Sequence, residues 1–182
     1  MARVIVYVDG SNFYHGLKGN LDRTDVDVFA FATKLAGADR LVKIEYYNSP
    51  RRQQDNAAQY RDQQLFFKYL NTVPGLPPIH LGRLEPRTRS CPKCNETYKI
   101  LVEKDVDVNI AVDMLTGAMD NAFDIAVLVS GDGDFHRLIG AVRKIGKKVK
   151  VAYFRKGQSQ ALVTACNGFI LLDDAFMAGC WR

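Results

Sequence analysis

The sequence predicts an α/β fold in which helices cover both faces of a mostly parallel central sheet. Short apolar runs rich in β-branched residues alternate along the chain with longer segments of helical spacing. This alternation is typical of parallel sheets covered by helices. The chain has 182 residues, 47% of them hydrophobic, which is enough for one domain with a sizeable core and a small insertion.

Six short runs are predicted strands because they are apolar enough to be buried on both faces of a sheet. They are residues 4–8, 41–47, 78–84, 125–129, 149–154 and 169–172. Four segments between them place apolar residues three or four positions apart, which predicts helices. They are residues 26–36, 54–71, 107–119 and 134–144.

A polar segment, residues 85–104, interrupts this alternation. It reads EPRTRSCPKCNETYKILVEK, so two short extended pieces flank a turn that contains Cys91 and Cys94. We expect a hairpin that projects from the sheet, because a segment this short cannot hold a second core. Residues 1–182 therefore form a single predicted domain with a hairpin insertion at 85–104.

Composition limits the classes of function. The net charge of +5 permits a polyanionic partner without demonstrating one. Four cysteines, only two of them close together, do not indicate a secreted disulfide framework. The apolar run at residues 4–8 is too short for a signal peptide, and no stretch approaches membrane-spanning length. We expect a cytoplasmic protein without a membrane partner.

Acidic residues cluster where the predicted strands end. Asp9 follows the first strand, and Asp132 and Asp134 follow the fourth. In a right-handed crossover the helix begins at the carboxyl edge of the sheet, so Asp107 joins them there. Carboxylates this close raise each other's proton affinity unless a cation lies beside them. The four acids therefore predict a shared cation site.

Each acid also has a simpler interpretation. Asp9, Asp132 or Asp134 could cap the helix that follows it, and Asp107 could act on a helix dipole. Three such positions at one edge favour the cation site instead. Oxygen ligands favour Mg²⁺ or Mn²⁺. We expect His15 and His136, which lie near the site in sequence, to pack or contact phosphate rather than catalyse.

Three segments, YVDGSNF at 7–13, KDVDVNIAVDML at 104–115 and VSGDGDF at 129–135, resemble the motifs of NYN-domain proteins. These form a branch of the PIN-like nuclease superfamily, and the LabA-like group within it is the most similar. The resemblance implies a PIN-like three-layer α/β/α sandwich, a Mg²⁺ or Mn²⁺ site and hydrolysis of RNA. It places the catalytic, metal-binding acids at Asp9, Asp107, Asp132 and Asp134.

The same motifs imply supporting roles for four further residues: Asn12, Ser130, Asp105 and Asp113. The family's partner amide falls on Asn12. Asp113 lies six residues after Asp107, about 120° away around an ideal helix. We therefore expect a supporting or surface role for Asp113.

Basic residues recur after the predicted strands, where they could bind an RNA backbone. The candidates are Arg51, Arg52, Arg87, Arg89, Arg155 and Lys156. Lys147 and Lys148 belong at the opposite edge of the sheet. Tyrosines near the strand ends could stack on bases or simply pack. They are Tyr46, Tyr47 and Tyr98.

Cys91 and Cys94 could form half of a zinc site. Zinc usually takes four protein ligands in a structural site, and no second pair lies in this segment. Cys166, Cys180, His80 or a second copy of the chain could complete it. An unmetallated turn is the favoured interpretation.

These observations predict a Mg²⁺- or Mn²⁺-dependent ribonuclease with RNA as its partner. The alternative is an RNA-binding or regulatory module that retains the metal site with little turnover. A haloacid-dehalogenase-type phosphatase is disfavoured because Ser11 stands where that class needs a second Asp. No glycine-rich loop ends in Gly-Lys-Ser/Thr, so a P-loop is absent. A homo-oligomer is left open.

Overall fold

A six-stranded, fully parallel sheet forms the centre of the computed structural model, which describes residues 1–182. Its order is β3-β2-β1-β6-β7-β8, and every neighbouring pair is parallel. The strands are β1 (Arg3–Asp9), β2 (Arg40–Asn48), β3 (His80–Leu81), β6 (Ile125–Val129), β7 (Lys148–Tyr153) and β8 (Gly168–Leu171). The strand order reverses between β1 and β6, which is where ligands bind in open parallel sheets.

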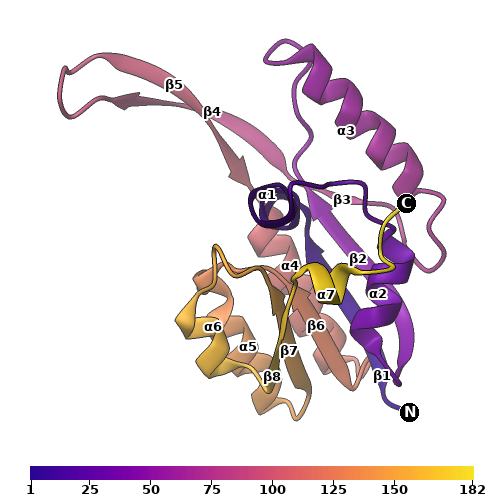
Figure 1. Cartoon of the computed structure of the whole chain (residues 1–182). Helices are drawn as coiled ribbons and strands as arrows, with labels where there is room; N and C mark the ends of the chain where they lie inside the picture. Colours follow the sequence, from indigo (N-terminus) through magenta and orange to yellow (C-terminus); the bar gives the residue numbers. More distant parts are fainter.

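Helices cover both faces of this sheet (Figure 1). They are α1 (Gly10–Leu21), α2 (Val28–Ala36), α3 (Ala57–Leu70), α4 (Val106–Met119), α5 (His136–Lys144), α6 (Gln160–Ala165) and α7 (Asp174–Met177), with a 3₁₀ turn, η1 (Gly133–Phe135). One core of 24 buried residues includes side chains of α1, α2 and α3. The other, of 17 residues, includes side chains of α4, α5 and α6. The predicted three-layer α/β/α arrangement is confirmed.

The central strand β1 shows why both faces need cover. Val4, Val6 and Val8 belong to one core, whereas Ile5 and Tyr7 belong to the other. Alternate residues of a strand point to opposite faces, so a continuous apolar run fills both layers. This is the pattern from which the strand was predicted.

The prediction of a strand over 78–84 is wrong in its extent. Only His80 and Leu81 pair with β2. The chain leaves the sheet at Gly82, where it passes so close to the Lys104 backbone that a Cβ would lie 2.4 Å from the carbonyl oxygen. Residues from Arg83 onward then pair with a different partner.

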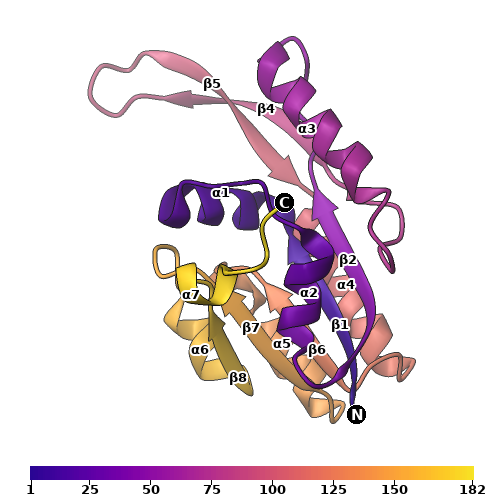
Figure 2. The same ribbon diagram turned by 45° about the vertical axis from the view of Figure 1, so that its right-hand side comes forward.

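These residues form the first strand of the predicted hairpin, which begins at Arg83 instead of residue 85 and ends at Lys104 as expected. It consists of β4 (Arg83–Ser90) and β5 (Thr97–Lys104), paired antiparallel in a sheet of their own. The hairpin projects from the body of the molecule in both views (Figures 1 and 2). Its base lies beside α4, and its turn is the part farthest from the central sheet.

Three helices escaped prediction: α1, α6 and α7. The first contains Gly10, Gly16 and Gly19, and glycine weakens helix propensity. Phe13 and Leu17 are buried from this helix, so tertiary packing holds it. The other two helices span only six and four residues, too few for periodicity to register.

No helix of the structure is both long enough and apolar enough to span a membrane.

Candidate functional site

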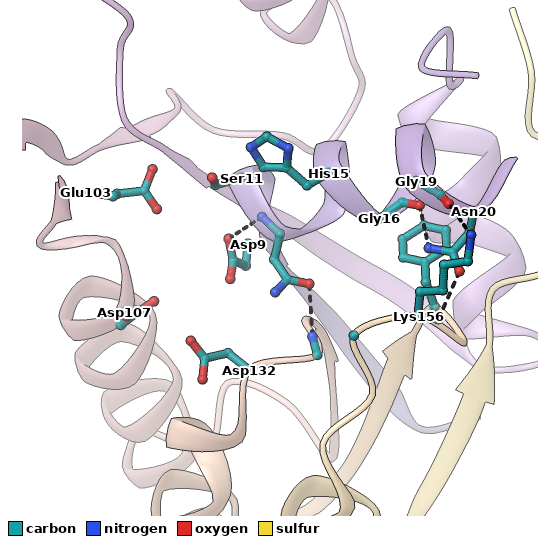
Figure 3. Close-up of a pocket in the computed structure, with 14 residues that line it drawn as sticks. Asp9, Ser11, His15, Gly16, Gly19, Asn20, Glu103, Asp107, Asp132 and Lys156 are labelled. Atoms are coloured by element: carbon teal, nitrogen blue, oxygen red, sulfur yellow. Dashed lines mark hydrogen bonds between the residues drawn. The ribbon is translucent and has the colours of Figure 1, made fainter. Parts of the chain in front are cut away.

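A pocket of about 390 Å³ opens at the carboxyl edge of the sheet, beside the point where the strand order reverses. Figure 3 shows four acidic side chains around it, Asp9, Glu103, Asp107 and Asp132. They come from β1, β5, α4 and the loop after β6. The topology thus gathers acids from positions far apart in the sequence.

Asp9 is the most buried of these acids, with 4% of its surface exposed. It ends β1 and caps α1: its Oδ1 accepts a hydrogen bond from the Asn12 backbone N–H at 3.0 Å. Its Oδ2 accepts one from the Ser130 hydroxyl at 3.1 Å. Burial raises the pKa of Asp9 to about 7, although both hydrogen bonds oppose the shift. The carboxylate is therefore held in place but lacks a compensating positive charge.

A hydrogen-bond network connects this acid to the loop after β6. The Ser130 hydroxyl also accepts the backbone N–H of Asp132 at 3.1 Å. The Asn12 side-chain oxygen accepts the backbone N–H of Gly131 at 3.0 Å. Asn12 and Ser130, both predicted as supporting residues, thereby position Asp9 and Asp132 relative to each other.

Gly131 allows a third loop to approach. A Cβ at this position would lie 2.2 Å from the carbonyl oxygen of Gly157, which follows β7. No side chain fits between two backbones at that distance. The glycine between the acids therefore serves a close approach of the loops after β6 and β7.

Asp107 lies in the first turn of α4 and lines the pocket, but unlike Asp9 it is exposed to solvent. Its pKa is raised, first by burial and then by the negative charges of Asp132 and Asp134. Asp107 and Asp9 thus both lie among other acids that raise their pKa, although only Asp9 is buried.

Asp132 and Asp134, which the sequence presents as a pair, occupy different environments. Asp132 lines the pocket and caps η1, its Oδ1 accepting the Asp134 backbone N–H at 2.9 Å. Asp134 is exposed and does not line the pocket. Capping of η1 thus occupies Oδ1 of Asp132, and its other carboxylate oxygen is available to a ligand in the pocket.

Glu103 was missed in the sequence. It lies near the end of β5 and lines the pocket beside Asp107. Burial raises its pKa, and the charge of Asp107 adds to the shift. Its position four residues before Asp107 was the available signal, but the residue was assigned to a polar insertion.

The structure places Asp105 and Asp113 outside the pocket. Asp105 forms an ion pair with Arg83 at the base of the hairpin. Asp113 accepts a hydrogen bond from the Tyr47 hydroxyl at 2.9 Å and lies 3.6 Å from Nδ1 of His80. Both acids connect α4 to its neighbours.

Lys156 lines the same pocket. Its backbone N–H donates to the Asn20 side chain at 2.9 Å and its Nζ donates to the Gly19 carbonyl at 3.3 Å. Arg155 beside it is exposed. Lys147 and Lys148, by contrast, lie at the start of β7, which is the opposite edge of the sheet.

A larger groove of about 590 Å³ adjoins the acidic pocket and shares Ser11, His15 and Glu103 with it. Side chains of α1, α3 and the hairpin base line it. Arg51 lies here: its side chain donates to the Gln59 side-chain oxygen at 2.8 Å, and its backbone N–H donates to the Gln63 side-chain oxygen at 2.7 Å.

The remaining predicted RNA contacts are distributed around the hairpin. Arg52 donates to the Leu84 carbonyl, whereas Arg87 and Arg89 are exposed on β4. Of the three tyrosines, Tyr46 and Tyr47 are buried and so pack rather than stack on a base. Tyr98 is 48% exposed on β5.

The pocket has the donor chemistry of a hard-cation site. Its acids offer only oxygen ligands, which suit Mg²⁺ or Mn²⁺. No group of three or more His, Cys, Asp or Glu side chains is arranged in the structure to hold a metal ion directly. A cation here would therefore take part of its shell from water or phosphate, as Mg²⁺ usually does.

Cys91 and Cys94 lie in the turn between β4 and β5, at the end of the hairpin that projects from the body of the molecule (Figure 2). All four cysteines of the chain are free. The structure brings neither His80 nor another cysteine to the pair as a metal ligand.

Comparisons with known proteins agree with this architecture. Residues 3–173 match the NYN domain family. A solved structure of a protein of unknown function from Vibrio parahaemolyticus RIMD 2210633 is similar, with 24% identity and a TM-score of 0.69. The similarity covers 95% of this chain and 94% of that one, and at this identity it supports the fold alone. No curated protein matches the chain.

Proposed function

The chain belongs to the NYN domain family, within the PIN-like nuclease superfamily, and we propose that it is a Mg²⁺- or Mn²⁺-dependent ribonuclease. The carboxylates Asp9, Asp107 and Asp132 would hold the metal together with water or phosphate oxygens, and Glu103 would support it from the hairpin side. We place the protein in the LabA-like group, in the cytoplasm.

One observation carries this proposal: a buried carboxylate, Asp9, faces other acids with no positive side chain to compensate it. An uncompensated buried charge is costly. A divalent cation beside the carboxylates would offset that cost, so the cluster of acids is suited to bind one. A purely structural cap would place Asp9 in water or beside a cation.

Each residue of the pocket has a separate role in the proposed hydrolysis. When bound, the metal ion lowers the pKa of a water molecule and stabilises the leaving oxygen. Asp9 and Asp132 would orient it, because Asn12 and Ser130 hold the Asp9 side chain and the backbone of the loop that carries Asp132. Lys156 binds the phosphate that enters from the other rim. The water gives up a proton to solvent as its oxygen bonds to phosphorus, the ester P–O bond breaks, and the leaving oxygen takes up a proton from solvent.

The adjoining groove gives the RNA a path away from the acids. It is continuous with the pocket through Ser11, His15 and Glu103, so a strand whose phosphate lies at the acids has its next nucleotide in the groove. Apolar side chains such as Phe66 and Leu101 offer surface to a base, and Arg51 offers charge to the backbone. Such a groove suits a single strand better than a duplex.

The test is cleavage of end-labelled RNA by the purified protein. Single-stranded and structured RNAs are incubated with Mn²⁺, Mg²⁺ or EDTA. The proposal predicts fragments with either metal, faster on single strands, and none with EDTA. Binding of RNA without cleavage under any metal would instead support the alternative, a regulatory module that retains the site.

A further inference from the structure

The turn of the hairpin, residues 91–96, has the geometry of a metal-binding knuckle rather than of an ordinary loop. The backbone N–H groups of Lys93 and Cys94 both donate to the Cys91 sulfur. The Asn95 backbone N–H donates to the Cys91 carbonyl at 2.9 Å, and Cys91 in turn donates to the Glu96 carbonyl at 2.8 Å. Asn95 has a φ of 56°, the left-handed conformation that closes the turn.

These contacts stabilise the thiolate form of Cys91. N–H donors favour the charged form, so the pKa of Cys91 is lowered, chiefly by the Lys93 and Cys94 backbone N–H groups. The Cys94 thiol also contacts Cys91, which places the two sulfurs side by side. Thiolates are the form that zinc binds.

The pair is half of a site. A structural zinc ion takes four protein ligands. The Cys94 thiol donates to the Glu96 carboxylate at 3.8 Å, but no group of three or more His, Cys, Asp or Glu side chains is arranged in the structure to hold a metal ion. The missing ligands must therefore come from outside the chain. Cys94 is exposed, Cys91 partly so, and the turn lies at the far end of a projecting hairpin (Figures 1 and 2), so nothing within the chain blocks an approach.

A second copy of the chain supplies what is missing. It carries the same two thiols, and a two-fold axis through the metal completes a tetrahedral set of four. The resulting centre has two excess negative charges, and Lys93 of each turn lies between its cysteines to offset them. An isolated two-stranded hairpin is only marginally stable in water, so the metal would also stabilise β4 and β5.

We propose that one zinc ion joins two copies of this chain at their hairpin turns, bound by Cys91 and Cys94 of each. Each thiol loses its proton to solvent as the zinc–sulfur bond forms. The arrangement brings the basic residues Arg87 and Arg89 of both hairpins close to one axis. The inference does not depend on the proposed nuclease activity.

The test measures zinc stoichiometry and oligomeric state together, on the full chain kept reduced. Native mass spectrometry and light scattering should show a zinc-dependent dimer with one zinc per two chains, which dissociates when a chelator is added. Replacing zinc with Co²⁺ should give the intense sulfur-to-metal absorption of a tetrathiolate. The double variant Cys91→Ser/Cys94→Ser should lose the zinc and remain monomeric.

Cys166→Ser is the matched control, because Cys166 is a free cysteine on the body of the molecule; it should keep both the zinc and the dimer. Three results would overturn the proposal: a monomer that binds one zinc, a reduced protein that binds none, or a dimer that persists in the double variant.

Discussion

The acidic pocket and the hairpin turn are two candidate metal sites built in opposite ways. The pocket draws Asp9, Asp107 and Asp132 from separate elements, and a hydrogen-bond network through Ser130 connects Asp9 to Asp132. The turn takes Cys91 and Cys94 from one short segment and leaves them at the surface. The pocket gathers its acids within one chain, whereas the turn offers only two thiols. A site buried at a sheet edge can be completed within one chain, and a site at a projecting tip needs another.

The largest effect is expected from removing a pocket carboxylate. Asp9→Asn and Asp107→Asn should each lower Mn²⁺-dependent RNA cleavage by roughly 100-fold or more, because metal binding and water activation fail together. Asp113→Asn is the matched control on the same helix as Asp107, and it should have far less effect. Cleavage rates at saturating metal measure the difference. If Asp113→Asn lowered the cleavage rate as much as Asp107→Asn, the assignment of the active residues would be wrong.

Loss of the supporting network comes next. Ser130→Ala removes the hydroxyl that donates to Asp9 and accepts from Asp132. Residues that orient metal ligands typically contribute about 10- to 100-fold to activity or metal affinity, and we expect a cleavage loss in that range. Mn²⁺ titrations of the rate should show that more metal is needed. A variant with the wild-type metal requirement would show that the network is only structural.

The two acids after β6 should separate. Asp132→Asn should reduce cleavage strongly, because Asp132 lines the pocket, whereas exposed Asp134→Asn should reduce it less. Folding should survive both changes, since asparagine caps a helix about as well as aspartate. Melting temperature without metal and cleavage with Mn²⁺ are measured on each variant. If the Asp132→Asn variant cleaved RNA at the wild-type rate, Asp132 would serve only as the cap of η1.

The pocket and the hairpin should also differ from the opposite edge in RNA binding. Removing a phosphate contact to single-stranded RNA lowers the slope of log affinity against log salt by about 0.7. Lys156→Ala, or the Arg87→Ala/Arg89→Ala pair, should each show such a decrease. Lys147→Ala/Lys148→Ala is the control, because both lysines lie at the far edge of the sheet. Equal slopes in all three variants would contradict the proposed RNA path.

The smallest effect concerns the pH dependence of stability without metal. The pKa of Asp9 rises from 3.8 to about 7 on folding, so its contribution is fully present below about pH 4 and is lost as the pH rises through 7. In EDTA, unfolding free energy should fall between pH 5.5 and pH 8 by up to a few kcal/mol. Asp9→Asn should flatten this change. A wild-type protein equally stable at both values would show that Asp9 is not desolvated.

The same contrast explains what could be predicted from the sequence. The acids Asp9, Asp107 and Asp132 follow strands or open a helix, and parallel-sheet topology alone brings such positions to one edge. Glu103 could not be found this way, because it reaches the pocket only through the path of the hairpin across the sheet edge. Helix α1 could not be predicted because its glycines lower the helix propensity of the segment, and the packing of Phe13 and Leu17 that stabilises it is a tertiary effect.

At the hairpin the sequence indicated the two cysteines but not their backbone geometry. The spacing of Cys91 and Cys94 is equally compatible with an ordinary turn, and only the N–H groups directed at the Cys91 sulfur distinguish a knuckle. Likewise, Asp132 and Asp134 are equivalent in the sequence. The 3₁₀ turn that follows Asp132 is what directs one toward the pocket and the other to solvent.

Mn²⁺ binding at pH 8 tests most directly whether the buried carboxylates form a metal site. Isothermal titration calorimetry is performed on the Cys91→Ser/Cys94→Ser protein, so that the thiols do not contribute, and on the same protein with Asp9→Asn added. The account predicts saturable binding in the first and a loss of roughly 100-fold or more in affinity in the second. No binding at millimolar Mn²⁺, or equal affinity in both proteins, would contradict it.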